Sequence, residues 1–410
     1  MSSPDVAAPP ERRTAQEVAD QLHQLWPDAA GVVVRSRRAA RSHAVSFVPL
    51  PSASRPRLLT PATPHRVAAA AVRSTTTPTG LRDRAVLAVA GAAARWGLLR
   101  LHPHRVVVDG NDAALAGSLP SRLGRQLGAD LVPSFYVGPV RAVQKPVIRL
   151  HRADGSSAAF AKVGSSDFTD ALVAREAAAL RVLGDVPWTT LRVPRLLAHQ
   201  RWNGHDVLVQ TALSSDGPAD LDLSLRALRE LVQAGEVVRT SLADSVWWHE
   251  LGRRTACLPD HPAADVLRRA VEALEALAPT LHVSQGRAHL DWAPWNMGRS
   301  GDVLSVWDWE QFSEGVPVGY DAVHYAVQDL VVLEQAHPVA AFATVRRQAP
   351  RLVERLGLSP AEGDLVVLLY VLDLASRYLE DGETGTRLSR LDGWLATVLS
   401  SFPLTAAAAS

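Results

Sequence analysis

Four polar side chains stand at fixed intervals in the segment AHLDWAPWNMGRSGDVLSVWDWEQ, which covers residues 288–311. His289, Asp291 and Asn296 form the pattern H-x-D-x4-N, and Asp308 follows seventeen residues after Asp291. A carboxylate can accept the proton of a hydroxyl group, while a second carboxylate and an amide oxygen can ligate Mg²⁺. Transfer of a phosphoryl group to a hydroxyl requires these groups, so the segment is a candidate catalytic site.

The spacing also predicts how these residues come together. Asp291 and Asn296 lie in one loop, and Asp308 ends a short strand, DVLSVWD, that returns toward that loop. Taken singly, each has a structural explanation: His289 as a packed side chain, and the loop residues as groups that bond their own backbone. Their joint occurrence in this order favours the catalytic interpretation.

A cation for the nucleotide phosphates is expected from an earlier part of the chain. The sequence has 41 arginines but only two lysines, Lys145 and Lys162, and Lys162 lies on a predicted strand. Where arginine is the usual cation, a lysine indicates a site that needs a compact ammonium group. Glu176 follows fourteen residues later on a predicted helix, where it could hold that ammonium. Taken singly, Lys162 would be a strand-edge charge and Glu176 a solvated helix residue.

These pieces resemble the aminoglycoside phosphotransferase and choline kinase superfamily, small-molecule kinases with a protein-kinase-like fold. HLDWAPWN is similar to the family's H-G-D-x4-N catalytic loop, and VWDWE to its strand-ending aspartate motif. FAKVG is similar to the family's phosphate-binding lysine strand, and AREAAAL to the helix that carries the partner glutamate. The resemblance covers roughly residues 127–400 and leaves the first 125 residues unexplained.

The resemblance implies that the chain uses ATP and Mg²⁺. Asp291 would orient and deprotonate the acceptor hydroxyl, and His289 would support the loop rather than react. Asn296 and Asp308 would bind Mg²⁺. Asp321, at the start of the next predicted helix, would brace the catalytic loop.

The resemblance assigns the nucleotide contacts to the first half of the kinase-like region. Lys162, paired with Glu176, would contact the α- and β-phosphates. The backbone of VLVQTAL, residues 207–213 with Gln210 and Leu213, would meet adenine. These residues therefore complete the set expected to bind the nucleotide.

The sequence departs from the family pattern at two places. Leu290 stands where the family usually has glycine. No glycine-rich loop is present, because the turn after Gly138 is PVRAVQ and the next glycine is Gly155. Capping of the phosphates by glycine amides is therefore not expected, and Arg141 is the candidate to contribute instead.

The expected fold class is α+β, a protein-kinase-like two-lobed fold preceded by an extra N-terminal α/β region. Residues 126–213 are predicted to form an N-lobe of five antiparallel strands with one helix, and residues 214–410 a mainly helical C-lobe. Residues 1–15 are expected to be a disordered tail, and residues 16–125 an arginine-rich extension of unknown role. Within this extension, the sequence over 31–50 predicts a β-hairpin.

Charge is distributed unevenly along the chain. Residues 31–108 contain thirteen arginines and one acidic residue, a net charge of +12, whereas residues 214–410 carry a net charge of −11. The two regions could dock on each other, or the basic one could bind nucleic acid, a membrane or a phosphorylated substrate. Phe47 and Trp96 are nearly alone as aromatic residues there, which argues against single-stranded nucleic acid. Two alternatives to catalysis stay open: a nucleotide-binding pseudokinase, and a regulator that binds an anion or nucleic acid through this region.

The acceptor is expected to be a small hydroxylated molecule such as a sugar, amino sugar, aminoglycoside or amino alcohol. About a dozen residues separate Asp308 from the helix predicted to begin at Tyr320, which leaves little room for the activation segment of a protein kinase. An acidic second half is compatible with an amine-bearing acceptor. Five aromatic residues are candidate walls of the acceptor pocket: Trp247, Trp248, His249, Trp292 and Trp295.

Composition predicts a cytoplasmic protein. The single cysteine, Cys257, fits a reducing compartment, and the first residues carry no apolar core of signal-peptide length. The longest apolar run, residues 85–94, is far shorter than the ~20 residues that a membrane-spanning helix needs. We therefore expect no membrane span, and the sequence does not predict the oligomeric state.

Overall fold

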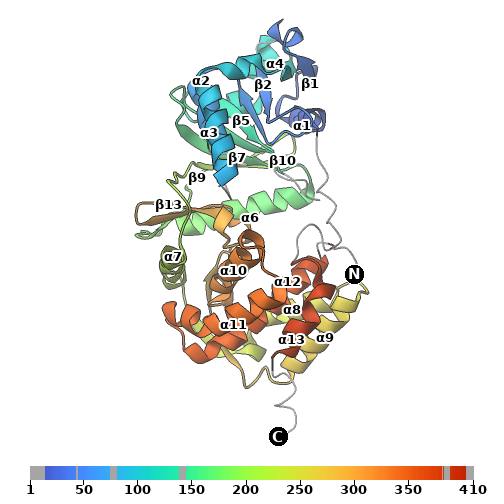
Figure 1. The fold of residues 1–410 in the computed structure, drawn as a ribbon, viewed down its shortest axis with the longest axis vertical. Coiled ribbons are helices and arrows are strands. Elements are labelled where there is room, and N and C mark those ends of the chain that lie inside the picture. Colours follow the sequence, from blue (N-terminus) through green and yellow to red (C-terminus); the bar gives the residue numbers. More distant parts are fainter. Residues whose placement is uncertain are drawn as a thin grey trace. The chain divides into compact units, whose positions relative to one another are not determined.

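The computed structural model describes residues 14–42, 45–73, 81–137, 145–380, 382 and 388–402. These residues belong to two compact units, between which the chain passes more than once (Figure 1). Unit 1 consists of residues up to 181 together with 194–212, and unit 2 of residues 182–193 together with 213–410. The tail expected over residues 1–15 lies outside the described residues as far as residue 13.

A nine-stranded antiparallel sheet forms the centre of unit 1, in the order β1-β4-β2-β3-β5-β6-β7-β10-β9. Its strands are β1 (Gly31–Ser36), β2 (Val45–Leu50), β3 (Leu58–Pro61), β4 (His104–Asp109), β5 (Val132–Tyr136), β6 (Val147–His151), β7 (Ser157–Val163), β9 (Leu196–Trp202) and β10 (His205–Thr211). The arginine-rich segment supplies β1 to β4, and the five strands predicted over residues 127–213 follow side by side. Pairing of β3 with β5 joins the two sets into one sheet.

The β-hairpin predicted over residues 31–50 is wrong, although both of its strands exist. β4 lies between β1 and β2 and pairs with both, so Val108 is opposite Val32 on one side and Val45 on the other. Three successive valines of β4, residues 106–108, are buried, and a strand that is apolar on both faces is favoured in the interior of a sheet. The true partner comes from a later part of the chain, which a local pattern does not reveal.

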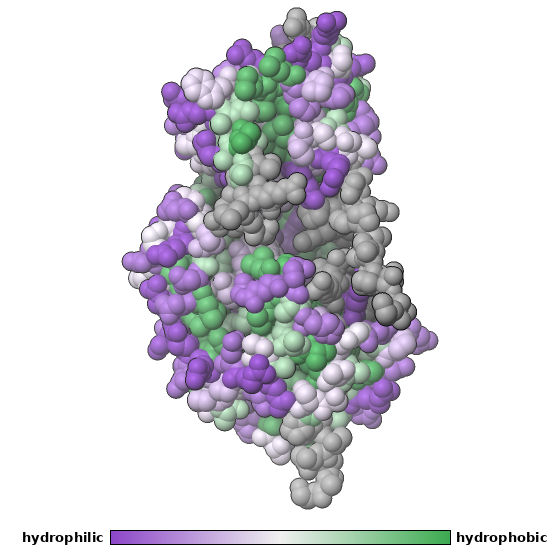
Figure 2. All heavy atoms as spheres, in the orientation of Figure 1, coloured by the Kyte–Doolittle hydropathy of each residue, from purple (hydrophilic) through white to green (hydrophobic). Residues whose placement is uncertain are grey.

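Helices cover both faces of this sheet. On one face, α1 (Ala15–Leu22) and α5 (Leu119–Gln126) share a core with apolar residues of both strand sets. The rings of Trp26, Phe47 and Phe135 meet there with centroids 5.0 to 6.1 Å apart. On the other face, α2 (His65–Arg73) and α3 (Leu81–Arg95) pack on β2 and β3. Apolar residues also reach the surface over α2 and α3 (Figure 2). The remaining helices of this part are α4 (Asp112–Ala116) and α6 (Asp167–Gly184).

Unit 2 is mainly helical. Its helices are α7 (Leu221–Gln233), α8 (Val246–Ala256), α9 (Pro262–Glu275), α10 (Tyr320–Gln328), α11 (Pro338–Arg355), α12 (Gly363–Glu380) and α13 (Leu395–Ser400). Two three-stranded sheets accompany them: β11 (Val238–Ser241), β12 (His282–Ala288) and β15 (Ser313–Pro317) in one, and β13 (Met297–Ser300), β14 (Val303–Val306) and β8 (Leu191–Arg192) in the other. Among the described residues, no helix combines the length and apolar composition needed to cross a bilayer.

The catalytic-loop segment is carried by this scaffold of strands and helices. It leaves β12, turns through the short helix η5 (Pro294–Asn296), and returns along the hairpin of β13 and β14. Beside it lies α12, which is buried over most of its circumference, as expected for a helix that is apolar nearly all round. Two polar residues of α12, Asp373 and Ser376, are nevertheless buried, which indicates that they have partners.

Candidate active site

The backbone of the catalytic loop is held by one buried carboxylate. Oδ2 of Asp321 accepts a hydrogen bond from the backbone N–H of His289 at 2.6 Å, and Oδ1 accepts one from Leu290 at 2.9 Å. Leu290 has φ of +66°, in the left-handed region that favours glycine, as the family pattern at this position would suggest. Burial raises the pKa of Asp321, while His289 and the two N–H donors act in the opposite direction. Asp321 therefore stabilises a loop conformation that leucine alone would disfavour.

Asp291 and Asn296 are joined by direct hydrogen bonds. The Asn296 amide nitrogen donates to Oδ2 of Asp291 at 2.7 Å and to its backbone carbonyl at 2.9 Å. Asn296 is buried, whereas the Asp291 side chain is 39% exposed. One carboxylate is thus both fixed by its neighbour and open to an incoming molecule. Because the side-chain nitrogen of Asn296 faces Asp291, the side-chain oxygen Oδ1 of Asn296 points away from Asp291 and is available to another partner.

His289 is a structural residue in this arrangement. Its Nδ1 accepts from the backbone N–H of Asp291 at 3.2 Å, so Nε2 carries the hydrogen that is donated to the Trp307 carbonyl at 3.1 Å. The ring is fully buried between Trp292 and Trp309, with centroids 5.8 and 4.6 Å away. Both nitrogens are used, which leaves none to exchange a proton with substrate. The imidazole instead ties the loop to the end of β14.

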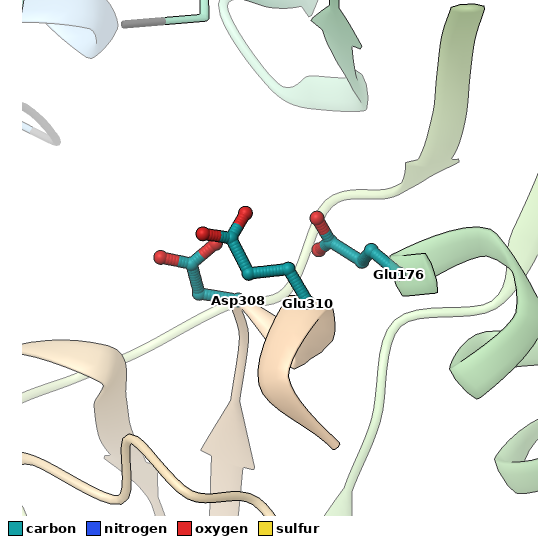
Figure 3. Close-up of side chains that lie close together, drawn as sticks. All are labelled: Glu176, Asp308 and Glu310. Atoms are coloured by element: carbon teal, nitrogen blue, oxygen red, sulfur yellow. The ribbon is translucent and has the colours of Figure 1, made fainter. Parts of the chain in front are cut away.

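Asp308 and Glu310 supply two carboxylates next to that end of β14. Asp308 has φ of +72° and directly follows Trp307. The backbone N–H of Trp307 donates to the backbone carbonyl of Asn296 at 3.1 Å. Glu310 lies in the short helix η6 (Trp309–Gln311), and its carboxylate comes within 4.8 Å of that of Asp308. Figure 3 shows these two side chains extending to the same side of the turn. Carboxylate oxygens so placed are suitable ligands for Mg²⁺.

Glu310 was not among the residues predicted to bind a metal. The signal for it is the spacing D-W-E in VWDWEQ, because a residue two positions after Asp308 in a tight turn can return to the same side. With Asn296 and Asp308, it gives three oxygen-bearing side chains on the loop and the strand end beside it.

His324 is a second residue that sequence reasoning missed. Its Nε2 is 3.4 Å from Oδ1 of Asp291, and its Nδ1 is 3.2 Å from the hydroxyl of Tyr370 on α12. The side chain is only 5% exposed, and Nε2 makes no hydrogen bond with the described residues. The available signal was its position three residues after Asp321, which places both side chains on one face of α10. His324 thus faces the carboxylate oxygen of Asp291 that Asn296 does not contact.

A buried network of charged side chains contacts the backbone of the catalytic loop. Arg377 on α12 approaches the Leu290 carbonyl at 3.4 Å and pairs with Asp373 at 3.1 Å. The Tyr320 hydroxyl donates to Asp373 at 2.5 Å, and Arg254 of α8 also pairs with that carboxylate. Burial alone would raise the pKa of Asp373, but Arg377 and Arg254 hold it below its ordinary value. The network connects α8, α10 and α12 to the backbone of the catalytic loop.

In unit 1, Lys162 and Glu176 form the predicted pair. Nζ of Lys162 lies 2.7 and 2.6 Å from the two carboxylate oxygens of Glu176 on α6, and both residues are buried. Glu176 is the third side chain drawn in Figure 3. Lys162 lies on β7, two residues after Phe160, so both project from the same face of the sheet. The Glu176 carboxylate thus fixes the position of the Lys162 ammonium group.

The remaining residues predicted to contact the nucleotide have different outcomes. Gln210 is opposite Phe160 in the sheet and shares its face, is buried, and its Oε1 has no hydrogen-bond partner among the described residues. Leu213 follows β10 and is partly buried, where the chain passes from unit 1 to unit 2. Arg141 lies outside the described residues.

The aromatic residues proposed as acceptor walls differ in how far they are buried. Trp292 is fully buried, and its indole N–H donates to Ser224 at 2.8 Å, so it is a core residue and does not face an acceptor. Trp248 is buried, and its indole nitrogen bonds Glu275. Trp248 and His249 line a cavity of about 690 Å³ between α8 and α9. Trp295 is partly exposed, as is Trp247, which shares a face of α8 with the Arg254 of the ionic network.

No protein-family model matches the sequence. No curated protein matches it either. Among solved structures, the aminoglycoside phosphotransferase APH(4)-Ia is similar with a TM-score of 0.48 and 15% identity, over 68% of this chain and 97% of that chain. Choline kinase LicA from Streptococcus pneumoniae is similar with a TM-score of 0.44 and 15% identity, over 65% and 92%. Spectinomycin phosphotransferase APH(9)-Ia has a TM-score of 0.39 and 13% identity, over 69% and 94%.

Proposed function

We propose that the chain is an ATP-dependent phosphotransferase that moves the γ-phosphate of ATP to a hydroxyl group of a small molecule. The observation that carries this proposal is Asp291, which is partly exposed, bonded to Asn296 and held on a loop whose backbone is fixed by Asp321. A braced loop that presents one open carboxylate beside an amide and two further carboxylates fits phosphoryl transfer to a hydroxyl.

Asp291 acts as the base in the proposed reaction. Its carboxylate accepts a hydrogen bond from the acceptor hydroxyl and takes the proton as the new oxygen–phosphorus bond forms. The bond between the γ-phosphorus and its bridging oxygen breaks, and ADP leaves with the electron pair. His324 faces Oδ1 of Asp291 while Asn296 holds Oδ2, and we assign His324 the role of a positioning residue.

The residues fit a divalent cation and a nucleotide. Asn296, Asp308 and Glu310 offer the hard oxygen atoms that Mg²⁺ prefers, and a bound ion would neutralise charge on the transferring phosphate. In unit 1, Lys162 held by Glu176 would contact the phosphates. Oε1 of Gln210 is buried on the same sheet face and has no hydrogen-bond partner among the described residues, and it would accept a hydrogen bond from adenine.

The segment after Asp308 supports a small acceptor over a peptide. η6 and β15 take up most of residues 309–319, and β15 pairs with β12 at the edge of its three-stranded sheet. α10 begins immediately afterwards at Tyr320. This short stretch leaves little room for the activation segment with which a protein kinase docks a peptide, so we propose a sugar, amino sugar, aminoglycoside or amino alcohol as the acceptor.

The proposal is tested by incubating the purified chain with γ-labelled ATP, Mg²⁺ and a panel of these hydroxyl compounds. We expect label to appear in at least one acceptor and to depend on added Mg²⁺. Asp308→Ala should abolish the Mg²⁺ dependence together with the transfer, whereas Asp302→Ala, an exposed aspartate of the same hairpin, should transfer normally. Binding of MgATP without transfer to any acceptor would instead indicate a pseudokinase.

A further inference from the structure

Four exposed apolar side chains gather at the end of α3 and in the turn that follows it. Val89 is 70% exposed, Trp96 80%, Leu98 53% and Leu101 64%. The Trp96 N–H donates to the Ala92 carbonyl, so the helical turn continues through Trp96, and Val89 lies on the same face seven residues earlier. Leu98 and Leu101 belong to the short helix η3 (Leu98–Leu101). We call Val89, Trp96, Leu98 and Leu101 the α3 apolar surface.

The outer face of α3 is apolar at its described positions between residues 85 and 92. Ala85, Ala88 and Ala92 are exposed beside Val89 and Trp96, while Ala94 packs inward on the sheet. Residues 85–94 contain no polar side chain. An apolar stretch of helix is normally packed against another surface. Among the described residues nothing covers this outer face, so the face indicates a partner outside them.

The charge around this surface limits what the partner can be. Arg66, Arg73, Arg95 and Arg100 are exposed on α2, α3 and η3. Residues 31–108 contain a single acidic residue, so the partner must be anionic or neutral. α3 lines neither the cavity beside Trp26 and Phe47 nor the cavity between α8 and α9.

We propose that the α3 apolar surface docks the chain on a bilayer that contains anionic phospholipid. Tryptophan and leucine side chains enter the boundary between headgroups and acyl chains, and surrounding arginines pair with the phosphates. Tryptophan favours this boundary because its ring is apolar and its N–H can bond to the headgroups. The basic N-terminal segment thereby has a partner of opposite charge, independently of the proposed phosphotransferase activity.

The proposal is tested by sedimentation of the full chain with sucrose-loaded vesicles. We expect binding to vesicles of equal parts phosphatidylcholine and phosphatidylglycerol, and none to phosphatidylcholine alone. Joint substitution Trp96→Ser, Leu98→Ser and Leu101→Ser should weaken binding by about tenfold or more. Val246→Ser in unit 2, at a residue that is 81% exposed, is the matched control and should bind as the wild type.

The ionic part of the interaction has its own control. Arg95→Gln with Arg100→Gln should weaken binding, and raising the salt concentration should weaken that of the wild type. Arg347→Gln with Arg351→Gln, at exposed positions of α11, should leave it unchanged. Because all these side chains are exposed, melting temperatures should stay close to that of the wild type and show that the variants are folded.

Three results would overturn the proposal. The first is a wild type that stays in the supernatant with anionic vesicles or binds neutral vesicles equally well. The second is a serine triple variant that binds as the wild type does. The third is a dimer in solution that the same triple substitution dissociates, because the partner would then be a second copy of the chain.

Discussion

The catalytic loop and the α3 apolar surface both place side chains against their usual preference, but in opposite directions. At the loop, the carboxylates of Asp321 and Asp373 are buried. At the α3 apolar surface, a tryptophan is 80% exposed. The loop's carboxylates find their partners inside unit 2, in backbone N–H groups and arginines. Trp96 is not packed against any of the described residues to a comparable extent. The loop is therefore stabilised from within the chain, whereas we propose that the α3 apolar surface binds a partner.

The largest effect should follow loss of the carboxylate at the centre of the ionic network. Asp373→Ala leaves the Arg254 and Arg377 guanidinium groups without their shared partner. Removing one partner of a buried ion pair costs about 3–5 kcal/mol, so the free energy of unfolding should fall by that amount. Urea unfolding measures it. Asp364→Ala, which removes a partly exposed pair with Arg346, should cost less than about 1 kcal/mol. Equal losses in the two variants would show that the network does not brace the loop.

The same carboxylate should make stability depend on pH. The pKa of Asp373 is lower in the folded chain than its ordinary value of 3.8 because Arg377 and Arg254 overcome the effect of burial. Its contribution is therefore complete above that value and is lost as the pH falls through the lower, folded-state pKa. Urea unfolding between about pH 5 and pH 3 should show a steeper loss for the wild type than for Asp373→Asn. Parallel curves would contradict the assignment.

A smaller effect on the reaction is expected from His324, which positions Asp291 without touching substrate. His324→Phe should lower kcat by about tenfold, because it removes the 3.4 Å contact between the imidazole and Asp291, and a loss of about 1.4 kcal/mol corresponds to a tenfold change in rate. KM for MgATP should not change, whereas a general packing defect would alter both. Tyr370→Phe removes only the hydroxyl that contacts Nδ1 of His324 and should lower kcat less. An unchanged kcat in His324→Phe would remove the residue from the site.

The left-handed conformation of Leu290 can be tested by two substitutions. Leu290→Gly removes a strain of about 1–2 kcal/mol but adds freedom to the unfolded chain, so stability should change by less than about 1 kcal/mol. Leu290→Val places a β-branched residue at the same positive φ and should be less stable than the wild type by about 1 kcal/mol or more. Calorimetric melting of the two variants distinguishes them. A stable valine variant would mean that the loop does not require this conformation.

The smallest effect on stability and activity is expected at the α3 apolar surface. Trp96→Ser removes an exposed side chain, so the free energy of unfolding should change by no more than about 0.5 kcal/mol and phosphate transfer in solution should not change. Chemical denaturation and the transfer assay check both. A loss of several kcal/mol would show that Trp96 is packed against part of the chain and is not available to a bilayer.

Sequence patterns predicted the elements better than their partners. The mixed α+β character of the chain and its mainly helical second half could be predicted, because the periodicity that indicates them is local. The join between β3 and β5, and the insertion of β4 between β1 and β2, were missed because they depend on pairing between distant segments. The arginine-rich segment was expected to be an extension of unknown role, yet its strands continue the main sheet.

The candidate site was predictable where chemistry restricts the residue type. Asp291, Asn296 and Lys162 could be predicted as candidates because each stands in a pattern that phosphoryl transfer requires. His324 and Glu310 could not be assigned in the same way, because their significance depends on where a helix and a tight turn direct them. Trp292 could be a core residue or an acceptor contact on sequence alone, and its burial identifies it as a core residue.

The most direct test of the central claim is single-turnover phosphate transfer by the wild type and Asp291→Asn at saturating MgATP. The substitution keeps the size of the side chain but removes the base. We predict that MgATP raises the melting temperature of both proteins equally, while transfer by the variant is slower by about 10²–10⁴-fold. Transfer by Asp291→Asn at the wild-type rate would contradict the account, because the braced carboxylate would then have no part in the chemistry.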